Sequence, residues 1–515
     1  MMRLRKLFLP VMLMLIQFAH ADNGNLPPDF RIRGFHLDLR IQVMKMPALR
    51  AFALKLSKEG INTLVMEWEG TYPFQDDPLI PNRFAYSRKD VKDFISYCQA
   101  LKIDVIPLQQ SFGHVDYILR NNRYAALRED DKDFSQVCPT EAALNKELFT
   151  RLFKDMISLH ASPYFHIGGD ETHLLGHCEK CKKRAAEIGI SRLYFEHIKL
   201  ICDIVISLGK QPVLWADIAL NYPQYLSLLP KQTILVDWNY GWELSRFGSH
   251  EQLVKSGYEI WGAPSLRSSP DNYFLTRWQY HFDNIKDFIP ACKGFGYKGI
   301  IMTSWSTSGV YEPVYESEDD LVELTALRHV YPISGFDILL QAYIRTIDSG
   351  SLSSEGFVSD YCRSNFDFNE KESKLFKTAL FSAPYAISNG KADVPGGMTI
   401  ETLLDSAEMA DKIFYSLRPK KNARLYSQYL LMADIRVYYL QYMKIEKDVN
   451  ADGLSQSGTP VFIERLKTLM KSEPLLNQRF VELNQDLLYP AAMEEENTLR
   501  NQKIHILYNR LSRIR

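Results

Sequence analysis

The sequence has few cysteines, and their number is odd. Seven cysteines in 515 residues exclude a small disulfide scaffold, in which many paired cysteines hold the fold together. A formal net charge of −1 leaves no basic excess for binding nucleic acid. After the N-terminal segment no stretch is apolar enough to span a membrane, and no internal repeat or low-complexity tract stands out. What is present is typical of a folded protein with two or more domains: 46% of the residues are hydrophobic and 24% are charged.

The N-terminus has the layout of a secretory signal peptide. A basic start is followed by an apolar run, 7–18, and by Ala19-His20-Ala21, which fits a small-x-small cleavage site. The run is shorter than the roughly 20 residues that cross a bilayer. We therefore expect residues 1–21 to be removed and the protein to be exported to the periplasm or the extracellular space.

Cys178 and Cys181 form a C-x-x-C pair close to His173 and His177. Three interpretations stay open for this pair: a local disulfide, two thiols without a special role, or a small structural zinc site. None of them makes the pair catalytic. We expect no metal ion and no other cofactor in the chemistry of this protein.

Eight apolar, strand-like runs alternate with helical patterns from residue 31 onward. The runs are 31–39, 63–69, 104–110, 164–169, 211–217, 233–240, 259–265 and 299–305. Helical periodicity separates them, as in Leu49, Phe52, Ala53 and Leu56 before Gly60. Eight βα units in about 300 residues predict a (β/α)8 TIM barrel, here over residues 22–335. An open doubly wound α/β sheet is the alternative, but no glycine-rich phosphate loop follows the first run.

Residues 336–515 show helical periodicity instead. One stripe contains Leu403, Ala407, Ala410, Phe414 and Leu417, and a second contains Leu431, Ile435, Tyr438 and Tyr442. Pro332 and Gly335 mark the boundary, after a last barrel helix at 321–329, and segments 391–397 and 451–460 are expected to be loops. The sequence therefore predicts an α-helical C-terminal domain packed on the barrel.

The fourth run ends in the stretch YFHIGGDET, 164–172. Its glycine pair permits a sharp turn, and two adjacent acids, Asp170 and Glu171, follow at once. Gly-Gly-Asp is also ordinary turn chemistry, so this stretch alone does not define a catalytic site. Its place at a strand end favours one, because TIM barrels hold their chemistry at the C-terminal ends of the strands.

Aromatic residues gather at the other strand ends. Five of the seven tryptophans fall there or just before: Trp68, Trp215, Trp238, Trp261 and Trp305. Aromatic faces stack on the apolar faces of sugar rings, so the pattern predicts a carbohydrate-binding cleft.

Two neighbouring acids constrain the chemistry of such a cleft. Most glycosidases place two carboxylates on opposite sides of the glycosidic bond, which adjacent residues cannot easily do. They can cooperate if a 2-acetamido group of the substrate attacks the anomeric carbon and forms an oxazolinium intermediate. Glu171 would then be the general acid and base, with a raised pKa in its resting state, and Asp170 would stay ionised beside the acetamido N–H.

The motif HIGGDE resembles the signature of glycoside hydrolase family 20, the β-N-acetylhexosaminidases. Other strand motifs resemble the hexosaminidase D-like branch of that family: FHLDLR, EWEGTYPF, AYSRKDV, DVIPLQQSFGH, VLWAD, VDWNY and GIIMTSW. The resemblance implies a TIM-barrel enzyme that releases terminal N-acetylglucosamine or N-acetylgalactosamine with retention. Its substrate is a small carbohydrate or glycoconjugate, and no cofactor is implied.

The resemblance also implies individual roles. Asp170 and Glu171 are the catalytic pair, Arg33 binds the sugar 3- and 4-hydroxyls, and Tyr240 aims the acetamido carbonyl oxygen at the anomeric carbon. The remaining positions implied in substrate binding are Glu67, His114, His166, Trp215, Asp217, Trp238 and Trp305. For both histidines a purely structural role near the barrel rim stays equally open.

One departure concerns the eighth strand. Family members often have Trp-x-Glu there, whereas Trp305 is followed by Ser306 and Thr307, so Glu312 or Glu316 would have to replace that acid. Preference for gluco or galacto configuration is therefore not predicted, nor are the natural glycan and the oligomeric state. Two other functions remain as alternatives: a glycosidase with a conventional nucleophile, Glu67 or Glu69, and a non-catalytic sugar-binding barrel.

Overall fold

The computed structural model describes residues 30–268, 271, 275–306, 330–382, 387–388, 391–392, 398–452 and 458–514. The expected signal peptide, the expected helix at 321–329, and Glu312 and Glu316 lie outside these ranges. Among the described helices, none combines the length and the apolar character needed to cross a membrane.

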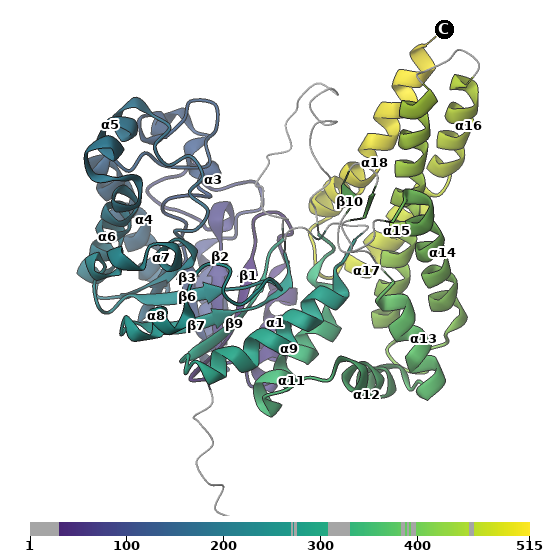
Figure 1. The fold of residues 1–515 in the computed structure, drawn as a ribbon, viewed down its shortest axis with the longest axis horizontal. Coiled ribbons are helices and arrows are strands. Elements are labelled where there is room, and N and C mark those ends of the chain that lie inside the picture. Colours follow the sequence, from purple (N-terminus) through teal and green to yellow (C-terminus); the bar gives the residue numbers. More distant parts are fainter. Residues whose placement is uncertain are drawn as a thin grey trace, which may run out of the picture.

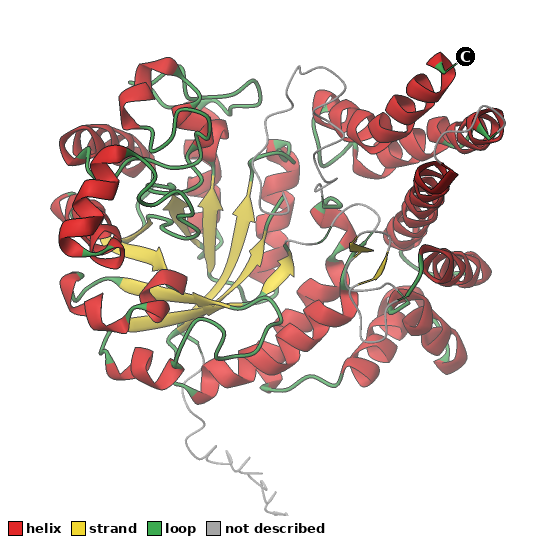
Figure 2. Cartoon of the chain, turned by 45° about the horizontal axis from the view of Figure 1, so that its top comes forward, coloured by secondary structure: helices red, strands yellow, loops and turns green. Residues whose placement is uncertain are grey.

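Eight parallel strands close into a barrel (Figures 1 and 2). They are β1 (Ile32–Asp38), β2 (Thr63–Glu67), β3 (Asp104–Leu108), β4 (Tyr164–His166), β5 (Gln211–Trp215), β6 (Ile234–Trp238), β7 (Glu259–Ala263) and β9 (Gly299–Ser304). Each of the eight predicted runs contains one of these strands. Pairing of β1 with β9 closes the sheet, which confirms the TIM barrel and excludes the open doubly wound sheet. A short strand, β8 (Ser265–Arg267), pairs with the C-terminal end of β9.

Helices surround the barrel. They are α1 (Met46–Lys58), α2 (Arg88–Ala100), α3 (Asp116–Leu119), α4 (Ala142–Leu159), α5 (Glu179–Ile188), α6 (Ile190–Ser207), α7 (Asp217–Asn221), α8 (His250–Lys255) and α9 (Trp278–Gly294). The predicted helical stripe before Gly60 lies in α1, and Gly60 has the positive φ of 77° that lets the chain turn after a helix. In α2, Ser87 caps the N-terminus by accepting a hydrogen bond from the backbone of Asp90.

The chain after the barrel is mainly helical, as predicted. Its elements are α11 (Asp337–Ser349), α12 (Ser354–Phe366), α13 (Glu370–Leu380), α14 (Ile400–Ser416), α15 (Ala423–Asp452), α16 (Thr459–Met470), α17 (Glu473–Asn484) and α18 (Pro490–Arg513). α13 to α18 form a helical region beside the barrel (Figure 1). One continuous hydrophobic core runs from the barrel helices into this region.

α11 belongs to the barrel by its contacts, although it follows the predicted boundary at residue 335. The hydroxyl of Tyr343 lies 2.7 Å from the carbonyl oxygen of Gly34 in β1 and 3.1 Å from that of Ile300 in β9. α11 therefore covers the two strands that close the barrel. We place the start of the helical domain after α11.

Two expected loops contain regular structure at their ends. β11 (Lys391–Ala392) pairs with β10 (Ile387–Ser388), and the segment 451–460 includes the end of α15 and the start of α16. A strand of two residues is set by its pairing partner and shows no periodicity of its own, so the sequence pattern missed it.

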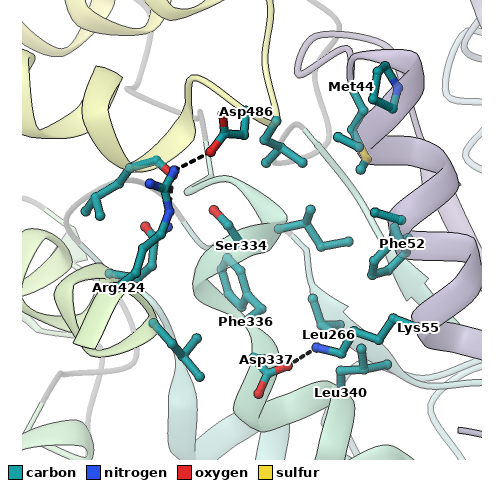
Figure 3. A pocket seen from close by; sticks show the side chains of 18 residues that line it. Met44, Phe52, Lys55, Leu266, Ser334, Phe336, Asp337, Leu340, Arg424 and Asp486 are labelled. Carbon is teal, nitrogen blue, oxygen red and sulfur yellow. Dashed lines mark hydrogen bonds and ion pairs between the residues drawn. The ribbon is translucent and has the colours of Figure 1, made fainter. Parts of the chain in front are cut away.

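A cleft of about 640 Å³ lies between the barrel and the C-terminal helices (Figure 3). Met44, Phe52 and Leu266 line it from the barrel side, and α15 and α17 contribute to the opposite side. An ion pair joins Arg424 to Asp486 at 2.9 Å. The lining does not include the Asp170–Glu171 corner, so this cleft is separate from the predicted site.

Candidate active site

The corner after β4 is built by two glycines with left-handed backbone. Gly168 has φ of +70° and Gly169 has φ of +95°, a region that side chains disfavour. A Cβ on Gly168 would overlap the side-chain oxygen of Gln110, and one on Gly169 would overlap a methyl group of Leu214. The backbone N–H of Trp215 and the hydroxyl of Tyr194 hold the two glycine carbonyls at 3.1 and 2.7 Å. The next two residues, Asp170 and Glu171, therefore follow the C-terminal end of β4 in a fixed direction.

Backbone strain gathers at this end of the barrel. Glu69, His114 and Glu171 have φ of 45°, 55° and 45°, and each follows the C-terminal end of a barrel strand. Such conformations cost free energy and cluster where function requires a fixed geometry. The strain is consistent with a functional site at these three loops.

His114 contacts both acids of the corner. Its Nε2 lies 3.6 Å from Oδ2 of Asp170 and 3.5 Å from Oε2 of Glu171. Burial opposes a charge on the imidazole, but the two carboxylates, Asp170 above all, raise the pKa of His114 well above its usual value. The site therefore contains an imidazolium between two carboxyl groups.

The pKa of Glu171 differs from the prediction. Burial favours the protonated carboxyl, but the hydrogen bond and charge of His114 outweigh it and lower the pKa of Glu171 below its usual value. The predicted raised pKa is wrong for the site without substrate. Glu171 must gain a proton before it can act as an acid. A weaker contact with His114 would raise the pKa of Glu171 and so favour its protonated form.

Asp217 is a third carboxyl at the corner. It is buried, and it accepts a hydrogen bond from Nε1 of Trp238 at 3.4 Å. Burial, followed by the negative charge of Asp170, raises the pKa of Asp217 to about 7. Asp217 therefore lies beside the acid pair, and the sugar-hydroxyl contact that we expected of it stays a prediction.

Three of the five strand-end tryptophans meet beside the acids. Nε1 of Trp305 donates to the hydroxyl of Tyr240 at 2.9 Å, and the ring centroids of Tyr240 and Trp238 are 4.9 Å apart. Trp215 lies 6.0 Å from Trp305 between ring centroids. Trp242, which the sequence did not single out, lies 5.6 Å from both Trp238 and Tyr240. Trp242 lies in the loop after β6, four residues beyond the strand end, so the pattern of strand-end residues did not include it.

The other two tryptophans are structural, which corrects the prediction. Trp68 is fully buried outside the barrel, where its Nε1 donates to Nε2 of His160 at 3.1 Å. Trp261 is fully buried in the middle of β7 and packs edge-on against Tyr164, the first residue of β4. Neither side chain is placed to stack on a bound sugar.

The predicted role of Arg33 is wrong. Arg33 is the second residue of β1, so it lies at the N-terminal end of the barrel, where it pairs with Asp348 of α11 and packs near Gly60. A side chain there cannot reach sugar hydroxyls at the opposite end. The motif FHLDLR, 35–40, ends in a second arginine, Arg40, which follows the C-terminal end of β1. No role for Arg40 was predicted from the sequence.

Arg40 is buried among acids and an aromatic ring. Its guanidinium lies 3.2 Å from Asp38, 3.5 Å from Glu67 and 3.4 Å from Glu69. Its Cζ is 5.1 Å from the ring centroid of Trp305. Arg40 therefore links β1 and β2 to the aromatic wall of the candidate site.

Glu67 and His166 lie inside the barrel. The carboxylate of Glu67 has no exposed surface and is held by Nε2 of His36 at 2.8 Å and Nε2 of Gln110 at 3.0 Å. Burial would raise its pKa, but Arg40 and His36 lower it to about 2. His166 is also fully buried, and burial lowers its pKa to about 3, so it is neutral. Both residues support the site from within the barrel rather than present a surface to sugar hydroxyls.

Replacing His114 with Asn is expected to shift the pH profile of the enzyme upward. Loss of the imidazolium removes the charge that lowers the pKa of Glu171, so this carboxyl, the expected general acid, stays protonated to higher pH. The alkaline limb of log kcat/KM against pH should move to higher pH, while His505→Asn, on the distant helix α18, should leave it in place. An unchanged limb in His114→Asn would show that His114 does not control this proton.

Comparison with known proteins fits this geometry. Residues 38–325 match the family model for the catalytic domain of glycosyl hydrolase family 20. Hexosaminidase D of Bos taurus is 26% identical over 294 residues, covering 53% of this chain and 84% of the relative, and hexosaminidase D of Homo sapiens is 24% identical over 312 residues, covering 57% and 63%. A solved β-N-acetylhexosaminidase from Bacteroides fragilis NCTC 9343 is 18% identical with a TM-score of 0.45, covering 54% of this chain and 61% of its own. Because the family model spans more than half of the 515 residues, the chain belongs to glycosyl hydrolase family 20, the family of the β-N-acetylhexosaminidases.

Proposed function

We propose that this enzyme is an exo-acting, retaining β-N-acetylhexosaminidase whose nucleophile is the 2-acetamido group of the substrate. One observation carries the proposal: a single atom, Nε2 of His114, contacts the carboxylates of both Asp170 and Glu171. The two acids thus lie in one corner. One carboxylate oxygen of Asp170, one of Glu171 and a ring nitrogen of His114 all lie within 4.8 Å of one another. Retaining enzymes with a carboxylate nucleophile instead hold their acids on opposite sides of the sugar, about 5–5.5 Å apart.

Asp170 and Glu171 have different surroundings, and we assign them different roles on that basis. Glu171, whose side chain is 39% exposed, protonates the departing oxygen and later takes a proton from the attacking water. Asp170, whose side chain is 9% exposed, accepts a hydrogen bond from the acetamido N–H. Oδ1 of Asp170 is buried and has no hydrogen-bond partner among the described residues, which leaves it available for that N–H.

Tyr240 is suited to orient the acetamido group. Its oxygen accepts the N–H of Trp305, so its own O–H is left to donate to the acetamido carbonyl. Burial raises the pKa of Tyr240 well above its usual value, which keeps this donor protonated. A donor at that oxygen fixes its direction of attack on the anomeric carbon.

Neither acid named in the conventional alternative, Glu67 or Glu69, is a suitable nucleophile. Glu67 has no exposed surface and is already bound by Arg40, His36 and Gln110. Glu69 has a side chain only 2% exposed, and burial raises its pKa well above the usual value, so it is a neutral acid. A sugar-binding barrel without catalysis would have no need of an acid pair in which Glu171 is held in a strained backbone conformation.

Substrate scope tests the proposal. Aryl β-N-acetylglucosaminide and β-N-acetylgalactosaminide should be hydrolysed, while the aryl β-glucoside with the same leaving group should not, since it lacks the acetamido nucleophile. A thiazoline that mimics the cyclised intermediate should inhibit competitively. Equal turnover of the 2-hydroxy and 2-acetamido glycosides would contradict substrate assistance, and the two acetamido substrates compare gluco with galacto preference.

We propose further that the enzyme is exported. The basic, apolar and small-x-small pattern of residues 1–21 supports this. N-terminal sequencing of the protein from its native host should give Asp22 as the first residue. A retained Met1 would contradict export by this route.

A further inference from the structure

Four potential metal ligands meet beside the N-terminus of α5. The sulfur of Cys138 lies 3.5 Å from the sulfurs of both Cys178 and Cys181. The carboxylate of Glu129 completes the group, with Oε2 at 3.2 Å from the sulfur of Cys181. One atom from each of the four residues lies within 4.8 Å of all the others. His173 and His177, the neighbours of the C-x-x-C pair in sequence, are not in the group.

We propose that Glu129, Cys138, Cys178 and Cys181 bind a structural Zn²⁺ ion. Structural zinc is four-coordinate and tetrahedral, with Zn–S distances of about 2.3 Å, which places the sulfurs about 3.8 Å apart. The two sulfur–sulfur distances of 3.5 Å are close to that separation. Three thiolates and one carboxylate form a complete ligand set for such a site.

The alternative of a disulfide fits the arrangement less well. Bonded sulfurs are about 2.05 Å apart, and all seven cysteines of the chain are free thiols in the structure. Cys138 lies equally far from both of its partners, so no pair is singled out. A disulfide between any two of these cysteines would also leave the third thiol beside the buried carboxylate of Glu129, with no cation in the group to balance that carboxylate. A zinc ion would bind all four groups.

The surroundings suit an anionic ligand set. Cys178 is the N-cap of α5, where the helix dipole stabilises negative charge, and its sulfur accepts the backbone N–H of Cys181 at 3.3 Å. The backbone N–H of Cys178 donates to Oε1 of Glu129 at 3.0 Å, leaving Oε2 for the metal. Thr140 places its hydroxyl 3.0 Å from the sulfur of Cys138. Hydrogen bonds of this kind orient ligands and are expected around a metal centre.

The site is closed, as a structural site must be. Side chains of Glu129, Cys138 and Cys181 are buried, and apolar side chains, Leu175 and Leu193 among them, pack around the cysteines. With four protein ligands no position remains for water or substrate. The ion would therefore stabilise the fold and take no part in hydrolysis.

Its position connects two loops of the active site. The segment that ends in Cys138 bonds to the loop of His114, through the N–H of Val115 to the carbonyl of Ser135 at 3.1 Å. It also bonds to the loop after Glu171, through the N–H of Leu174 to the side chain of Gln136 at 3.0 Å. Zinc would fasten this segment to α5, and so restrain the two loops that bring His114 to the acid pair.

Metal analysis of untagged, full-length enzyme tests the proposal. About one equivalent of zinc per chain is expected, and replacement by Co²⁺ should give the thiolate charge-transfer and intense d–d bands of a tetrahedral site. Removal of zinc with a chelator under reducing conditions should lower Tm, and Zn²⁺ alone should restore it. These readouts do not depend on activity, so they remain valid if the proposed hydrolytic mechanism fails.

Variants locate the ion. Cys138→Ser and Glu129→Gln should each lower the zinc content, whereas Cys202→Ser, another buried thiol beside a hydroxyl, should keep one equivalent. If Cys138→Ser does not fold, the metal content and cobalt spectrum of the wild type still decide. Wild-type enzyme without metal, or with a mass two hydrogens lower that shows a disulfide among these cysteines, would overturn the proposal.

Discussion

Glu171→Gln is expected to lose turnover in proportion to how much the leaving group needs a proton. General acid catalysis contributes about 10²- to 10⁴-fold, so an alkyl or sugar leaving group should show a loss of that size. The dinitrophenolate of a dinitrophenyl β-N-acetylglucosaminide departs without protonation. Cleavage of this substrate's glycosidic bond should therefore be nearly unaffected in Glu171→Gln. The slope of log kcat/KM against leaving-group pKa should therefore become steeper in this variant.

Asp170→Asn is expected to show a different pattern. In the proposed mechanism Asp170 stabilises charge on the acetamido group, so its loss should cost about 10²- to 10³-fold with every leaving group. The contrast between the two variants assigns the roles, which a simple loss of activity cannot do. Asp203→Asn, a change of the same kind on the exposed face of α6, serves as the control.

Initial rates on a series of aryl glycosides check both expectations. The same steepening in both variants would show that Asp170 also takes part in proton transfer. Unchanged turnover in Glu171→Gln with the poorest leaving group would end its assignment as the general acid.

The barrel could be predicted because each strand carries its own signal. A buried parallel strand is apolar on both faces, so its run is visible in the sequence, and eight runs with helices between them leave few topologies. The helix that covers the closing strands was harder to place. Tyr343 of α11 bonds to Gly34 of β1, 309 positions earlier, and to Ile300 of β9, 43 positions earlier, and contacts over such separations leave no local pattern.

The placing of Asp170 and Glu171 side by side at a strand end could be predicted because the two acids are contiguous in sequence, but their electrostatics could not. Glu171 was expected to have a raised pKa, yet His114, 57 positions earlier in the chain, lowers it. The same limit applies to Arg33 and Arg40, since the end of the barrel that each occupies depends on where β1 begins. It applies again to the zinc ligands, because the C-x-x-C pair is local whereas Cys138 joins it only through the fold.

Gly168→Ala is expected to destabilise the enzyme by about 3 kcal/mol or more. Alanine at a left-handed φ costs about 1–2 kcal/mol by itself. At Gly168 the added methyl group would also overlap the end of the Gln110 side chain, whose Cδ lies 2.7 Å from the Cβ position. Gln110 cannot easily move aside, because its amide donates to the buried carboxylate of Glu67.

Gly350→Ala separates the two costs. Gly350, at the end of α11, has φ of +71°, almost the same as the +70° of Gly168, but nothing lies within 4 Å of its Cβ position. Urea unfolding of both variants should therefore show only the backbone cost at Gly350 and the larger cost at Gly168. A Gln110→Ala background should reduce the effect of Gly168→Ala, since the overlap is then absent. Equal destabilisation of Gly168→Ala and Gly350→Ala would mean that Gln110 does not confine the corner, and that backbone conformation alone explains the glycine before Asp170 and Glu171.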